Sequence, residues 1–133
     1  DNPKNVIRML EDPKSILKKI KSAVTDMDNP PLVAFDWDKK PGISNLLELM
    51  SAATGREIPE LVEHFKGSMY GSFKSEVGEA VVALLEPIQQ RYREIRNDEG
   101  YMQEIFEQGA AKAAERAAKT LKVVYDKIGF VVY

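Results

Sequence analysis

The chain has 133 residues, of which 44% are hydrophobic, enough for one domain with a single core. Its 19 lysines and arginines against 21 aspartates and glutamates give a formal net charge of −2. This balance excludes a globally basic surface for DNA, other nucleic acids or acidic membranes, so any such binding is expected to be local. The lack of cysteine excludes disulfides, thiol nucleophiles and cysteine-bound zinc, and the single histidine excludes a histidine-built metal site.

No apolar run approaches the roughly 20 residues that a membrane-spanning helix needs. The first 20 positions, rich in Asp, Asn, Lys and Pro, do not resemble a secretory signal. We therefore expect a cytoplasmic protein that makes no membrane contact.

Helical periodicity between proline and glycine positions predicts an all-α bundle of about five helices. The first well-marked helix starts at Asp12-Pro13, because aspartate caps a first turn and proline fits the first helical position. Its apolar residues recur at helical spacing as far as Val24. The opposite face of this helix carries Lys14, Lys18 and Lys21.

Residues 25–41 break this helix, because Pro30-Pro31 cannot continue it and the surrounding Asp and Asn residues favour turns. At most one short extended segment, near 32–37, is expected there. Helical periodicity returns after Pro41-Gly42 and stops near Gly55. A short helix is expected over 59–67.

A long helix is predicted over 73–95, interrupted by Pro87, which removes the hydrogen bond to the Ala83 carbonyl and should bend the helix. The last helix is predicted over 101–127, with small residues in the middle of its apolar face. The residues of that face, expected to point inward, are Met102, Ile105, Phe106, Gly109, Ala113, Ala117, Leu121 and Val124.

The sequence contains no phosphate-binding loop, no dinucleotide fingerprint and no H-E-x-x-H metal motif. The acid pairs Asp26/Asp28 and Asp36/Asp38 lack a histidine or a third carboxylate and fit solvated turns. We therefore expect no catalytic residue, metal ligand or cofactor within this chain.

Six collinear strings nevertheless point to one family. They are KKIKSAVTD (18–26), KPGISNLL (40–47), SMYGSFK (68–74), LLEPIQQRY (84–92), QGAAKA (108–113) and VYDKIGF (124–130). In this order and spacing they closely resemble the C-terminal helical region of bacterial tryptophanyl-tRNA synthetases, which are class I enzymes.

The resemblance implies that residues 1–133 form the C-terminal helical domain, which recognises the anticodon of tRNA(Trp). The parent enzyme would use ATP and magnesium to attach tryptophan to that tRNA, and would act as a homodimer bridged by the tRNA. Asp1-Asn2-Pro3-Lys4 resembles the stretch that follows the K-M-S-K-S-type loop of the family. The Rossmann catalytic domain would then precede residue 1, and the 133-residue chain alone is expected to be inactive.

Anticodon bases are unpaired, so aromatic rings can stack on them and polar groups can bind their edges. Aspartates accept hydrogen bonds from base amino groups, whereas lysines and arginines contact phosphates. The candidate RNA-binding residues are Asp26, Asp28, Trp37, Lys39, Lys40, Asn45, Arg93 and Arg96. Ordinary roles remain open for them: Trp37 as part of the core, Asp26 as a turn former, Asn45 as a helix cap and the cations as solvated charges.

Two other functions also remain open. One is the equivalent region of a tyrosyl-tRNA synthetase, against which the KPGISNLL and QGAAKA strings argue. The other is a non-catalytic helical interaction module that has kept the fold without the activity.

Overall fold

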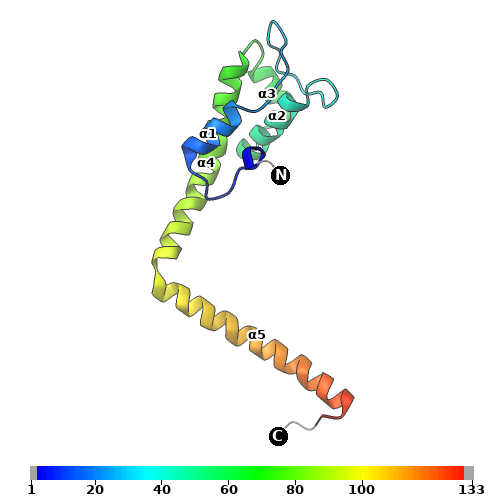
Figure 1. The fold of residues 1–133 in the computed structure, drawn as a ribbon, viewed down its shortest axis with the longest axis vertical. Coiled ribbons are helices and arrows are strands. Elements are labelled where there is room, and N and C mark those ends of the chain that lie inside the picture. Colours follow the sequence, from blue (N-terminus) through cyan, green and yellow to red (C-terminus); the bar gives the residue numbers. More distant parts are fainter. Residues whose placement is uncertain (1–2, 131–133) are drawn as a thin grey trace. The chain divides into compact units, whose positions relative to one another are not determined.

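The computed structural model describes residues 3–130, and these residues form helices without any strand, as predicted. Asp1 and Asn2, part of the quoted N-terminal resemblance, lie outside the described residues. The elements are a 3-10 helix η1 (Pro3–Asn5) and the helices α1 (Pro13–Lys21), α2 (Pro41–Thr54), α3 (Ile58–His64), α4 (Tyr70–Asn97) and α5 (Glu99–Ile128). The chain divides into two compact units, residues 1–90 and 91–133. In the first unit, η1 and α1 to α3 gather around the N-terminal part of α4 (Figure 1).

The helix boundaries follow the capping signals in the sequence. The Asp12 carboxylate accepts a hydrogen bond from the Ser15 backbone N–H at 3.1 Å, which caps α1 as predicted. Helix α2 starts at Pro41 and stops at Gly55, whose φ of 72° is the left-handed conformation that glycine tolerates best. Residues 31–36 between α1 and α2 are irregular.

The predicted long helix is present as α4, which runs from Tyr70 to Asn97, but Pro87 lies inside it and does not interrupt it, contrary to the prediction. Both Pro87 and Ala83 are exposed. Water can therefore hydrogen-bond to the Ala83 carbonyl, which lacks an intrahelical donor, so the proline costs less here than in a buried helix.

The core of the first unit contains side chains from all four of its α-helices and from the loop before α2. Its largest members are Phe65 and Phe73, whose rings meet edge to face with centroids 4.8 Å apart. Helix α1 lies close against α4 at Gly78, where an added Cβ would come within 2.8 Å of Leu17 Cδ2. The buried apolar residues are Ile16, Ile20, Val33, Ile43, Leu46, Leu47, Met50, Leu61, Phe65, Phe73, Val77, Val81 and Leu85.

Gly42, at the start of α2, lies directly against the backbone of the preceding loop. A Cβ added there would be 2.2 Å from the Val24 carbonyl oxygen. We expect Gly42→Ala to lower the free energy of unfolding by about 1–3 kcal/mol, the usual cost of overpacking. Urea titration followed by the fluorescence of Trp37, the only tryptophan, would measure this loss in the first unit. Gly71→Ala is the control, because an added Cβ meets nothing within 4 Å at that position in α4; equal effects of the two changes would contradict the prediction.

The second unit consists of the end of α4 and the 30-residue helix α5. No residue of α5 is buried in the structure, so the stripe predicted to point inward does not face a core: Met102 is half-buried and the other members, including Ile105, Phe106 and Leu121, are exposed. The physical reason is that a helix and a short end of another helix cannot enclose an apolar face from all sides.

Within residues 3–130, no helix is both long enough and apolar enough to span a bilayer. The same residues hold no cluster of three or more histidine or acidic side chains arranged to bind a metal ion.

Candidate functional site

Lys40 lies at the centre of a polar cluster between the loop 25–40 and the start of α4. Only 9% of Lys40 is exposed. Its ammonium group donates to the Asp26 carboxylate at 3.0 Å, to the Asp28 carboxylate and to the Tyr70 hydroxyl at 3.3 Å. Lys40 and the two aspartates belong to the loop and Tyr70 belongs to α4, so the cluster ties the loop to the helical core.

Tyr70 completes this cluster from the first turn of α4. Its hydroxyl donates a hydrogen bond to the Asp26 carboxylate and accepts one from the Leu32 backbone N–H at 3.3 Å. Tyr70 therefore fixes two points of the loop, one on each side of Pro30-Pro31. We name Asp26, Asp28, Lys40 and Tyr70 the loop anchor.

The charges in the loop anchor stabilise one another. Burial disfavours ionisation of Asp26, but the hydrogen bonds from Tyr70 and Lys40 outweigh it and lower the pKa of this carboxyl group. Burial likewise opposes the charge on Lys40, yet the Asp28 and Asp26 carboxylates raise the pKa of the ammonium above its usual value. Burial, together with the Asp26 hydrogen bond, raises the pKa of Tyr70. At neutral pH the anchor thus holds a charged lysine, a charged Asp26 and a neutral tyrosine.

A turn at residues 36–40 precedes α2 and is fixed by Asp36. The Asp36 carboxylate accepts hydrogen bonds from the backbone N–H groups of Asp38 and Lys39, both at 3.0 Å. The hydrogen bonds from these two N–H groups lower the pKa of Asp36, and the one from Lys39 has the larger effect. The Asp36 backbone N–H in turn donates to the buried Ser44 hydroxyl of α2 at 2.9 Å. Asp36 is therefore a turn former, as expected for this pair of acids.

Two aromatic side chains flank Asp36 and stand on the surface of the turn. The rings of Phe35 and Trp37 meet edge to face, with centroids 6.2 Å apart and planes at 77°. Trp37 is 50% exposed and Phe35 39% exposed, so Trp37 is not part of the core. The neighbouring Lys39 is exposed as well. An exposed indole and a lysine on a fixed turn can together receive a planar group and an adjacent negative charge.

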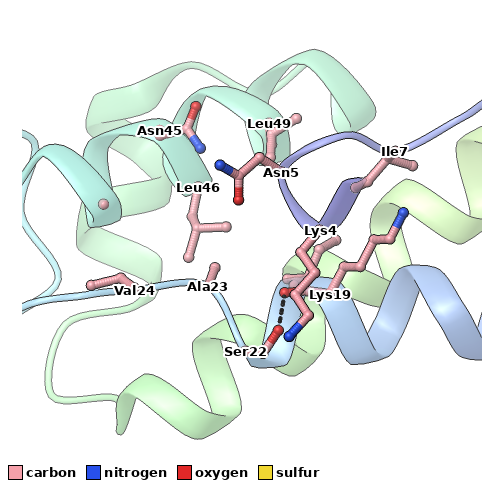
Figure 2. A pocket seen from close by; sticks show the side chains of 12 residues that line it. Lys4, Asn5, Ile7, Lys19, Ser22, Ala23, Val24, Asn45, Leu46 and Leu49 are labelled. Atoms are coloured by element: carbon pink, nitrogen blue, oxygen red, sulfur yellow. Dashed lines mark hydrogen bonds between the residues drawn. The ribbon is translucent and has the colours of Figure 1, made fainter. Parts of the chain in front are cut away.

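Asn45 lies elsewhere in the first unit, on an exposed face of α2. It lines a pocket of about 560 Å³ between the segment 4–7, the end of α1 and the first turns of α2 (Figure 2). Asn5 lines the same pocket. Asn45 caps no helix end, because it lies inside α2, four residues after Pro41.

Arg93 and Arg96 belong to the second unit, near the C-terminal end of α4, and both are exposed. Arg96 Nη1 lies 3.8 Å from the Met102 sulfur. The loop anchor and the two arginines therefore lie in different units.

The chain segment 6–11 is held in place by two side chains that sequence reasoning did not identify. Lys19 donates to the Val6 carbonyl at 2.7 Å and pairs with the Glu11 carboxylate at 2.6 Å. The hydrogen bond from Lys19, with one from Ser15, lowers the pKa of Glu11 to about 2. Gln89 of α4 is buried and donates to the Met9 and Glu11 carbonyls at 2.8 and 3.0 Å.

Comparison with known proteins identifies the family. The family model of class I tRNA synthetases for W and Y matches residues 1–86, and the chain belongs to this family. Among solved structures, the chain is similar to the crystal structure of tryptophanyl-tRNA synthetase from Mycoplasma pneumoniae, with 25% identity and a TM-score of 0.74. The similarity covers 97% of this chain and 39% of that chain. This chain thus spans well under half the length of that synthetase.

Proposed function

We propose that this chain is the C-terminal helical part of a tryptophan-tRNA ligase and that it recognises and positions tRNA(Trp) through its anticodon. Membership of the class I family and the similarity to a tryptophanyl-tRNA synthetase support this proposal. The observation that carries it is the exposed Phe35/Trp37 pair, presented on a turn that is anchored to α2 and α4. A rigid aromatic surface is the arrangement that unpaired bases need for stacking.

In this proposal the candidate residues have different tasks. Trp37 stacks on an unpaired base, and the exposed Lys39 contacts a neighbouring phosphate. Asp28, with 45% of its side chain exposed, can still accept a hydrogen bond from a base amino group. Asp26 and Lys40 act mainly through the loop anchor, because their charged groups are engaged with each other and with Tyr70. Asn45, Arg93 and Arg96 remain candidate contacts to other parts of the RNA.

The segment 6–11 has a coupling task in the same proposal. By the resemblance it follows the loop that closes over ATP, and it is held to α1 by Lys19 and to α4 by Gln89. Movement of the anchored helices would thus be transmitted to that segment. This chain has no phosphate-binding loop, so ATP and magnesium would bind to the remainder of a cytoplasmic homodimeric enzyme.

The whole protein is expected to attach tryptophan to tRNA(Trp) in the presence of ATP and magnesium, whereas the 133-residue chain alone forms no tryptophanyl-adenylate. The reason is that no position of this chain matches a catalytic motif of the class. Tryptophan-dependent exchange of pyrophosphate into ATP, measured for both proteins, tests this. Adenylate formation by the isolated chain would contradict the assignment of the chemistry to the remainder.

A second candidate is the equivalent region of a tyrosyl-tRNA synthetase, because the matching family model covers both W and Y enzymes. The same exchange assay on the whole protein separates the two when each amino acid is supplied in turn. Exchange with tyrosine alone would support the tyrosyl enzyme. No exchange with either amino acid would support the non-catalytic interaction module.

A further inference from the structure

Helix α1 carries a basic face that the proposed anticodon site does not use. Lys14, Lys18 and Lys21 are exposed and fall within about 60° of arc at 100° per residue. Together with Leu17 and Ser22 they line an open depression of about 540 Å³ on the surface of the first unit. The first and last of the three lysines are about 10 Å apart along the helix axis, at 1.5 Å per residue. The face is therefore a compact group of three positive charges on a chain whose net charge is negative.

Pairing within the protein does not account for this face. Helix α1 contains no acidic residue, and the flanking acids are engaged elsewhere: Glu11 with Lys19 and Asp12 with the Ser15 backbone N–H. None of the ion pairs found among residues 3–130 includes Lys14, Lys18 or Lys21. Like charges three and four residues apart on a helix repel each other by a few tenths of a kcal/mol per pair. Among residues 3–130, no ion pair offsets this repulsion.

The helix dipole does not account for the face either. Lysines in the last turn of a helix are favourable, which covers Lys18 and Lys21. Lys14, however, lies in the first turn, where the dipole disfavours a positive charge. An external polyanion that contacts all three lysines would explain both their alignment and the position of Lys14.

We propose that the Lys14/Lys18/Lys21 face of α1 binds the phosphodiester backbone of the tRNA, at a surface separate from the loop that recognises the anticodon. The choice of RNA as the polyanion rests on the proposed function. Contacts from lysine ammonium groups to phosphates carry no base information, so this face contributes affinity for tRNA without selecting among sequences. It would hold the RNA body while the Phe35/Trp37 turn engages unpaired bases.

The test is binding of a tRNA(Trp) transcript to the whole protein by fluorescence anisotropy, between 50 and 200 mM KCl. Replacing Lys14, Lys18 and Lys21 together by Gln should raise the Kd about tenfold or more at the lowest salt and reduce the salt slope by about 2 to 3. The same replacement should raise the Kd by the same factor when the tRNA carries a changed anticodon, because this face does not read the bases. Replacing the same three lysines by Arg should keep both the affinity and the slope.

The matched control replaces Lys66, Lys112 and Lys122 by Gln, which removes the same charge from other exposed positions. If this control weakens RNA binding as much as the α1 variant does, the effect is one of net charge and the proposal is wrong. The proposal is also wrong if the α1 variant binds RNA unchanged, or if it loses affinity only for vesicles of anionic phospholipid. Failure of the proposed function gives a different result: the whole protein would not charge tRNA(Trp), while the α1 variant would still lose RNA affinity.

Discussion

Trp37→Ala in the whole enzyme is expected to lower kcat/KM for charging of tRNA(Trp) about tenfold to a hundredfold. Removing an aromatic ring from a base stack costs about 1–3 kcal/mol per base. Trp37 is half exposed and contributes little to the buried core, so the loss should come from RNA contact and not from unfolding. Formation of tryptophanyl-adenylate, measured separately by pyrophosphate exchange, should be unchanged because no RNA takes part in that step.

Two further changes make this prediction specific. Trp37→Phe keeps a ring that can stack and should retain most of the activity. Met27→Ala removes a large apolar side chain that is 96% exposed in the same loop, and it should leave charging unchanged. Loss of adenylate formation in Trp37→Ala, or an equal loss of charging in Met27→Ala, would show that the aromatic pair serves folding or domain coupling instead.

Most of the fold could be predicted because its signals are local. Asp12-Pro13, Pro41 and Gly55 mark helix boundaries through capping and backbone preferences that act within one turn, and the structure places the boundaries there. The long helix on both sides of Pro87 was predicted, but its interruption at Pro87 was not found, because the cost of an interior proline depends on whether solvent reaches the freed carbonyl. Whether water reaches the Ala83 carbonyl depends on how the rest of the chain folds, so the sequence around Pro87 does not show it.

The candidate site was predicted only in part. The sequence showed that the loop 25–41 was irregular, polar and aromatic, and these features are local. It did not show that Lys40 would be buried, because the partners of Lys40 lie 12, 14 and 30 residues away along the chain. Exposed lysines are far more common than buried ones, and only a converging set of acceptors makes burial of the charge tolerable. Gln89 was missed for the same reason, since it bonds to carbonyls about 80 residues earlier.

Lys40→Met is expected to destabilise the first unit by about 1–3 kcal/mol at pH 7, because it leaves a largely buried carboxylate without its charged donor. The carboxylate most affected is that of Asp26, because its side chain is only 18% exposed and water replaces the lost donor poorly there. Lys39→Met is the control: it removes the neighbouring, exposed lysine and should change stability by no more than about 0.5 kcal/mol. Urea unfolding followed by Trp37 fluorescence measures both variants.

Two measurements identify the loop anchor as the cause of this loss. In a double-mutant cycle, Asp26→Asn combined with Lys40→Met should cost less than the two single changes added together, by about 0.5 kcal/mol or more, because the residues interact directly.

The pH dependence of this stability loss has a definite sign. The folded state lowers the pKa of Asp26 below its ordinary value of 3.8, so the contribution of this ion pair is present above that pH and is lost as the pH falls further. The stability difference between the wild type and Lys40→Met should therefore be constant near neutrality and shrink below about pH 3.8. A difference that stays the same at acid pH, or strict additivity in the cycle, would mean that the aliphatic part of Lys40 and not its charge holds the loop.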